Sequence, residues 1–502
     1  MVRKPRHDTE RDLSFTDTIS HTGRRIAAAA MLAALALIAL LALRPAPASA
    51  STSEWSFFED HSYLVRSTPT VRQNTLDEIK ALGADTLRVE VKWNEVAPQP
   101  DSRTKPSFDA TDPAAYPGFW PYDDLMQRAT AMGFRIMITL APDAPRWATG
   151  GKRGGNYKVS STEFARFARA VGRRYSGAFA GLPAVRVWSL WNEPNHIFFI
   201  KPRSEAPRVY RRMVEKGLPA LRATAPSGSK IFVGELAPVG TATKVLGPLR
   251  FLRAWLCLDN NYRRLRGSAA RKAGCSNFKK VSASGFAHHP YGPFGLPPAK
   301  RDIVNIAAIK RLAKALDLAA RAGRITKRLP IYNTEFGFQT NPPDPFVSTS
   351  PLRQAQILNE KEEFSYRYSR LKSYSQYLLY DDPPRSGSAA LRWAGFQTGL
   401  RFPAPGGAVK PSYDAYKYPI VVRRRGSGVY VWGRVRPGKG IRYVQLERRS
   451  GSSFVKDGPE IDTNFSGYFK VNRSRRATYR FQYVTGIGGT VIGTSRTAAP
   501  IK

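Results

Sequence analysis

The stretch VWSLWNEPN at 187–195 is the most informative about the fold. In it a short apolar run ends in a glutamate. The run is rich in aliphatic and aromatic residues and is too short for a helix, which is typical of a buried strand. A segment with helical periodicity follows at 204–224. Strand then helix is the unit of a parallel sheet, since parallel neighbours need a crossover connection.

The same alternation repeats on both sides of this stretch. Eight strands, each followed by a helix, predict a closed (β/α)8 TIM barrel. An open doubly wound sheet is the alternative, but the sequence lacks the Gly-rich phosphate turn that such sheets usually carry. The expected strands lie at 54–58, 85–91, 134–140, 184–191, 230–236, 282–288, 329–336 and 373–380; the expected helices lie at 71–82, 121–132, 161–179, 204–224, 301–322, 351–371 and about 410–418.

From about residue 421 the pattern changes to short alternating runs separated by Gly, Ser, Asp and Asn. Such runs predict a small all-β sandwich domain. The expected domains are therefore a leader over 1–50, a barrel over 51–420 and a β-sandwich over 421–502.

The leader has the features of an export signal. A polar segment ends in Arg24 and Arg25, an apolar run without charge covers 26–43, and a small-residue cleavage site follows at 48–50. The run is also long enough to span a bilayer, so a cleaved signal peptide and an N-terminal membrane anchor both fit. Either one predicts that residues 51–502 are secreted or extracytoplasmic.

The net charge of +41 comes from 79 Lys+Arg against 38 Asp+Glu, and the basic residues run through the whole chain. This charge favours anionic partners such as envelope polymers or an acidic polysaccharide. The alternative is a solvated basic surface without a function. The sequence carries no nucleic-acid recognition module, and we predict no nucleic-acid partner.

Only two cysteines occur, Cys257 and Cys275. In an exported chain a disulfide between them is the simplest interpretation, and two unrelated buried thiols are the alternative. Neither cysteine lies near other metal-ligand residues, so we predict no metal site and no cofactor.

Two glutamates close expected strands. Glu193 ends the fourth strand, and Glu335, in IYNTEFG at 331–337, ends the seventh. In a barrel enzyme the active face lies at the carboxyl ends of the strands. Retaining hydrolysis of a glycosidic bond needs two carboxyl groups that face each other across that bond. The pair therefore predicts a retaining glycosidase.

WNEP after the fourth strand and TEFG after the seventh resemble clan A of the glycoside hydrolases, over about residues 55–420. Within the clan the chain is most similar to the cellulase-like family five and the xylosidase/iduronidase family thirty-nine. The resemblance implies a carbohydrate substrate, with Glu193 as general acid/base and Glu335 as nucleophile. It also implies that Asn192 hydrogen-bonds the 2-hydroxyl of the sugar.

The resemblance extends to three further residues. Arg88, in LRVEV at 87–91, matches the clan's arginine beside the nucleophile; an ion pair with Glu90 on one strand face is the alternative. In HPY at 289–291, Tyr291 would hold the carboxylate of the nucleophile, and His289 would lie near the sugar. His288 points the other way in an extended segment, and we expect it to be structural.

The chain departs from the clan in two places. Where a Trp platform often follows the eighth strand, the sequence reads YDD at 380–382, and Trp393 is the nearest substitute. After the third strand Trp147 could stack on a sugar or simply pack. Glu235 ends the fifth strand, and we expect a salt-bridged structural residue there. A catalytically weak barrel that acts as an envelope carbohydrate-binding or scaffold protein is the alternative function.

Overall fold

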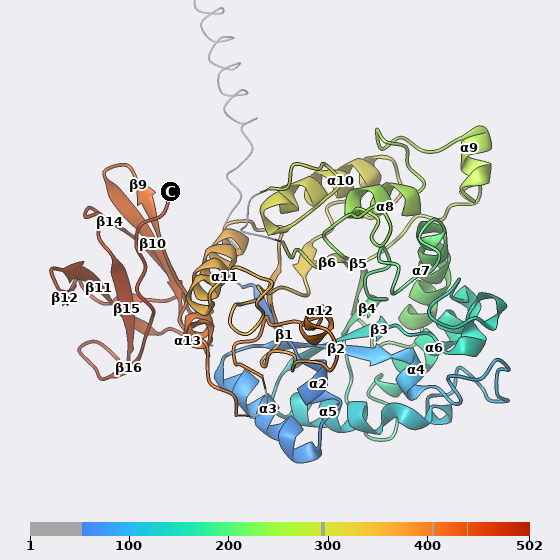
Figure 1. Cartoon of the computed structure of the whole chain (residues 1–502), viewed down its shortest axis with the longest axis horizontal. Coiled ribbons are helices and arrows are strands. Elements are labelled where there is room, and N and C mark those ends of the chain that lie inside the picture. The colour runs from blue at the N-terminus through green and yellow to red at the C-terminus, as the bar shows by residue number, and fades with distance from the viewer. Residues whose placement is uncertain (1–52, 293–296, 404–405, 439) are drawn as a thin grey trace, which may run out of the picture. The chain divides into compact units, whose positions relative to one another are not determined.

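The structure is a computed structural model that describes residues 53–292, 297–403, 406–438 and 440–502. Eight parallel strands form one sheet in the order β7-β6-β5-β4-β3-β2-β1-β8. A bridge between Ile331 and Leu371 joins the two edge strands, so the sheet closes into the predicted barrel (Figure 1). The strands are β1 (Trp55–Glu59), β2 (Thr86–Lys92), β3 (Arg135–Ala141), β4 (Val187–Leu190), β5 (Lys230–Leu236), β6 (Gly285–His288), β7 (Ile331–Asn333) and β8 (Ser373–Tyr377).

Helices surround this sheet (Figure 1). Several begin at a side chain that caps a free backbone N–H: Thr68, Ser160 and Ser350 each accept from the third residue that follows. Their apolar faces pack against the strands in one continuous core. The main helices are α3 (Pro69–Ala81), α5 (Trp120–Ala131), α6 (Ser161–Arg174), α7 (Ala206–Arg222), α8 (Pro248–Trp255), α10 (Ile309–Arg321), α11 (Pro351–Tyr366) and α13 (Pro411–Lys417).

One strand differs from the expectation in a way that matters for the site. The sequence predicts an eighth strand up to residue 380, but β8 ends at Tyr377 because Leu378 has a φ of 80°, which extended backbone does not allow. Asp381 is instead buried in an ion pair with Lys410, with 2.7 Å between Oδ1 and Nζ.

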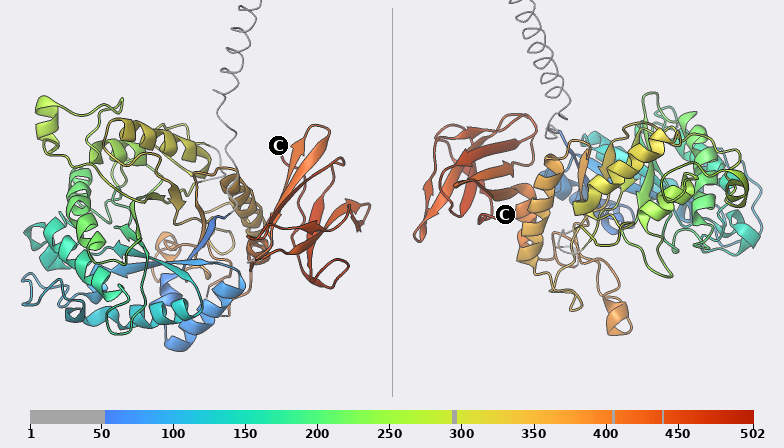
Figure 2. Two further views of the ribbon diagram at one scale, coloured as in Figure 1. Left: turned by 180° about the vertical axis from the view of Figure 1, so that it is seen from behind. Right: turned by 90° about the horizontal axis from the view of Figure 1, so that it is seen from above.

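The C-terminal part is all-β, as predicted, and consists of two antiparallel sheets (Figure 2). Their shared core includes Val429, Leu446 and Phe481. One sheet contains β9 (Ile420–Arg425), β10 (Gly428–Arg434) and β14 (Tyr468–Arg473); the other contains β11 (Tyr443–Ser450), β12 (Ser453–Lys456), β13 (Ile461–Asp462), β15 (Tyr479–Val484) and β16 (Val491–Thr494).

Residues 50–502 form one compact unit. Glu362 of α11 accepts hydrogen bonds from Arg434 and Arg436, and all three side chains are buried. A buried ion pair of this kind is costly to break, because loss of one partner leaves an uncompensated charge. The predicted leader over 1–50 lies outside the described residues, and the predicted domain boundaries stay predictions.

Cys257 and Cys275 form a disulfide, which confirms the predicted pairing. The bridge connects the end of α8 with the segment that follows the short helix α9 (Gly267–Lys272). Among the residues that the structure describes, no helix is long and apolar enough to cross a membrane.

Candidate active site

The turn after β4 presents Glu193. Trp191 and Glu193 have φ angles of 71° and 37°, which are strained for residues with a side chain. Neighbouring contacts hold this backbone: the Glu193 N–H donates to the carbonyl of Glu235 at 3.0 Å. Asn195 bonds both backbone groups of Ala237, at 3.0 Å and 2.9 Å. Asn195 of the WNEPN motif thus anchors the turn to the end of β5.

Glu335 follows β7, and two side chains hold its carboxylate. The Tyr291 hydroxyl donates to Oε2 at 3.1 Å. Nη1 of Arg88 lies 2.8 Å from Oε1. The structure thus brings Arg88, Tyr291 and Glu335 together.

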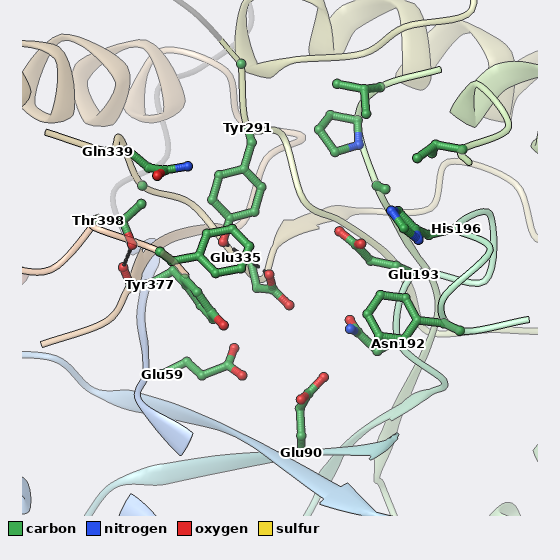
Figure 3. A pocket seen from close by; sticks show the side chains of 18 of the residues that line it. Glu59, Glu90, Asn192, Glu193, His196, Tyr291, Glu335, Gln339, Tyr377 and Thr398 are labelled. Atoms are coloured by element: carbon green, nitrogen blue, oxygen red, sulfur yellow. Dashed lines mark hydrogen bonds between the residues drawn. The ribbon is translucent and has the colours of Figure 1, made fainter. Parts of the chain in front are cut away.

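The two predicted catalytic glutamates meet at one cavity. A carboxylate oxygen of Glu193, a ring nitrogen of His289 and a carboxylate oxygen of Glu335 all lie within 4.8 Å of one another. His289 bridges the pair, with Nδ1 at 3.0 Å from Oε1 of Glu193 and 3.4 Å from Oε1 of Glu335. Figure 3 shows the two carboxyl groups facing each other across the cavity. His288, by contrast, bonds the carbonyl of Val304 at 2.7 Å, away from the glutamates.

Arg88 is the cation at the centre of the site, and it is fully buried. It donates to Glu59 and, at 2.9 Å, to Oδ1 of Asn192. It also lies 3.4 Å from Glu90, so the ion pair with Glu90 and the contact with Glu335 exist together. Because Asn192 accepts through Oδ1, its amide NH₂ is the group left for a ligand.

Two clusters of side chains have metal-binding distances: Glu193, His289 and Glu335, and Glu59, Glu90 and Glu335. Arg88 contacts every member of the second cluster and so already supplies a positive charge there.

Glu235 has the structural role that the sequence predicts. Its side chain is fully buried and pairs with Arg88 at 2.8 Å. Thr139 donates to its other oxygen at 3.1 Å. Neither Glu235 nor these two partners are among the residues that line the cavity.

Burial sets the protonation of the site. It raises the pKa of Glu193 to about 8, and the attraction of Arg88 offsets this only in part. Burial also raises the pKa of Glu335, against a lowering by Arg88. Arg88 and Tyr291 contact Glu335 directly, and both contacts favour the ionised form of Glu335 over that of Glu193. Burial, then Arg88, lowers the pKa of His289 well below its usual value, which keeps the ring neutral.

The cavity has a volume of about 920 Å³ and an acidic lining. The positive net charge of +41 is therefore not concentrated at the cavity. Arg66 and Lys92 are the basic residues of the described lining. The acidic ones are Glu59, Glu90, Glu95, Asp143, Glu193 and Glu335.

Sequence reasoning missed most of the cavity lining, including Glu59, Glu90, Tyr377 and Phe396. Glu59 directly follows the expected strand 54–58 and so has the same strand-end signal as Glu193 and Glu335, but it lies in no recognised motif. Glu90 stands two residues from Arg88 on the same strand face, but the sequence offered it only as an ion-pair partner. Tyr377 was hidden because the expected strand ran past it. Phe396 comes from an irregular loop, which carries no pattern.

Trp147 and Trp393, the two tryptophans considered for contact with a sugar, do not line the cavity. Trp147 is buried edge-on against Trp93 and Phe108, and its Nε1 donates to the carbonyl of Pro98 at 3.3 Å. It is a packing residue. Trp393 is not among the residues that line the cavity, whereas Phe396, three positions on, is.

No protein-family model and no curated protein matches the chain. Solved structures do. A monomeric β-xylosidase from Caulobacter crescentus CB15 is 15% identical over 86% of this chain and 96% of that one, with a TM-score of 0.49. A glucosidase from Croceicoccus marinus is 11% identical over 85% and 94%, with a TM-score of 0.48. A GH5_18 protein from Bifidobacterium longum subsp. infantis is 15% identical over 73% and 78%, with a TM-score of 0.44.

The likeness is one of fold.

Proposed function

We propose that the protein is a retaining glycoside hydrolase with Glu193 as general acid/base and Glu335 as nucleophile. The observation that carries the proposal is the approach of the two carboxyl groups, whose nearest oxygens lie within 4.8 Å at the mouth of the barrel. Retaining enzymes keep their carboxyl groups about 5–5.5 Å apart, whereas inverting enzymes need room for a water molecule between them.

The first step needs an acid and a nucleophile at the same pH. Glu193, whose pKa is raised to about 8, supplies the proton to the leaving oxygen. Glu335 attacks the anomeric carbon, and Arg88 at 2.8 Å keeps its carboxylate ionised. The bond from carbon to the leaving oxygen breaks as the bond from carbon to Glu335 forms.

In the second step water hydrolyses the glycosyl-enzyme. Glu193 has lost its proton to the leaving group and now accepts one from the water. The Tyr291 hydroxyl, 3.1 Å from Oε2, donates a hydrogen bond to Glu335 and stabilises the negative charge that returns to this carboxylate when it leaves the anomeric carbon. Aromatic rings of Tyr291, Tyr377 and Phe396 line one side of the cavity and offer faces for the sugar.

The test is a pair of alanine variants in residues 50–502. Glu335→Ala should abolish turnover on every substrate, because no bond to the anomeric carbon can form. Glu193→Ala should spare the first step on aryl glycosides with good leaving groups, and azide should rescue its second step with retained configuration in the azide product. An active Glu335→Ala, or an inverted product from the unaltered protein, would refute the proposal. Glu95→Ala, at the cavity rim, serves as a control for loss of a lining carboxylate.

A further inference from the structure

Exposed basic residues ring the amino ends of the barrel strands, the end opposite to the cavity. For each strand from β3 to β8 one such residue stands at the strand's start or up to five positions before it, Lys280 before β6 being the most distant. Parallel strands of a barrel all begin at the same end, so these side chains share one face. We call this the basic face; it is defined by Arg135, Arg186, Lys230, Lys280, Arg328 and Lys372, which are all exposed.

Five of these six residues line two depressions in the surface. Arg135, Arg186 and Lys230 line one depression, and Arg328 and Lys372 line another. The backbone of Lys230 also donates to the carbonyl of Arg186 at 2.8 Å, so these two residues are neighbours.

Few carboxylates offset this charge. Asp85 lies 3.2 Å from Arg135. Among the described residues that line the two depressions, Asp317 is the acidic one. It forms an ion pair with Arg370, with 2.6 Å between Oδ2 and Nη1. Within the barrel the charge of the chain is thus divided, with an acidic cavity at the carboxyl ends of the strands and the basic face at their amino ends.

The chain also enters the barrel at this face. Trp55, the first residue of β1, lines the same depression as Arg135, whose guanidinium lies 4.0 Å from the centre of the Trp55 ring. In the sequence, Trp55 comes 12 positions (55 − 43) after the apolar run 26–43. A linker of that length spans at most roughly 40 Å, even when fully extended. An anchor over 26–43 would therefore tether the barrel by the end that carries the basic face.

We propose that the basic face binds the anionic headgroups of a lipid bilayer and leaves the cavity directed away from the membrane. Each Lys or Arg near an anionic bilayer contributes about a fivefold gain in partition, and the gain falls off within a Debye length of about 8 Å at physiological salt. Six cations at one end of the barrel suit a bilayer, which presents many anionic headgroups side by side. This inference concerns the barrel surface and holds whether or not the protein hydrolyses glycosides.

The experiment is sedimentation of residues 50–502 with vesicles of phosphatidylcholine, alone or mixed with phosphatidylglycerol. The protein should bind the mixed vesicles only, and added salt should release it. The variant Arg186→Gln, Lys230→Gln, Lys372→Gln should lose about a hundredfold in partition. The matched control is Arg208→Gln, Arg212→Gln, Lys216→Gln, which removes the same charge from three exposed positions on the outer side of α7.

Loss of binding in the basic-face variant alone supports the proposal. Equal loss in both variants would show that net charge acts without a site and would overturn it. Absence of binding to the mixed vesicles would also overturn it. So would binding to soluble polyphosphate, without binding to vesicles, that depends on the basic face, since the partner would then be an anionic polymer.

Discussion

Nδ1 of His289 lies 3.0 Å from Oε1 of Glu193. The ring is neutral, because burial and Arg88 lower its pKa. A neutral imidazole can share one hydrogen with a protonated carboxyl group, but it adds no positive charge that would ionise it. The contact therefore orients Glu193 and leaves it in the acid form, in contrast to Glu335, which faces the guanidinium of Arg88.

The pH dependence of the first step should reveal this acid. Glu193 acts while protonated, so kcat/KM for a glycoside with a poor leaving group should fall as the pH rises through about 8. An activated aryl glycoside needs no proton, and its kcat/KM should stay level over the same range. An equal fall in kcat/KM for both substrates would show that a group other than Glu193 causes the pH dependence.

Replacement of Arg88 should lower the free energy of unfolding of the protein. Arg88→Met leaves Glu59, Glu235 and Glu335 buried around no cation, and this should cost about 3–5 kcal/mol in the free energy of unfolding. The loss should be smaller at pH 5 than at pH 8, because protonated carboxyl groups need no counter-charge. Urea titrations at the two pH values measure it. Arg128→Met, which breaks the more exposed pair with Asp124, is the control and should cost about 1 kcal/mol or less.

The acidic cavity should discriminate against acidic sugars. For matched aryl glycosides and aryl glycosiduronates, kcat/KM should be at least about tenfold lower for the uronate, since six acidic residues line the cavity against two basic ones, Arg66 and Lys92. Glu90→Gln should reduce the difference in kcat/KM between the two substrates, while Glu447→Gln in the β domain should leave that difference unchanged. A preference for uronates would contradict this and restore the expectation drawn from the net charge.

The disulfide should contribute to stability through the unfolded chain. Cys257 and Cys275 are 18 positions apart, and a loop of that size corresponds to about 3 kcal/mol in the chain-entropy model. Urea unfolding of the Cys257→Ala, Cys275→Ala double variant, compared with the intact protein, gives the value. Alkylation of the unreduced protein should label no thiol; two labelled cysteines would refute the bridge.

The sequence by itself was enough for the barrel, the all-β C-terminal part and the disulfide. It was also enough to select Glu193 and Glu335, because strand ends are visible as local patterns and parallel strands bring their carboxyl ends to one face. Arg88, His289 and Tyr291 were named in advance from the motif resemblance alone.

Only the tertiary structure decided which charges meet. Glu59 on β1, Glu90 on β2 and Glu335 after β7 converge on Arg88, and no local pattern shows which side chains from separate strands will meet. The end of β8 at Tyr377 depends on one backbone angle at Leu378. The division into an acidic cavity and a basic face is likewise absent from the net charge of +41. A sum over the chain carries no position, whereas electrostatic recognition depends on distance.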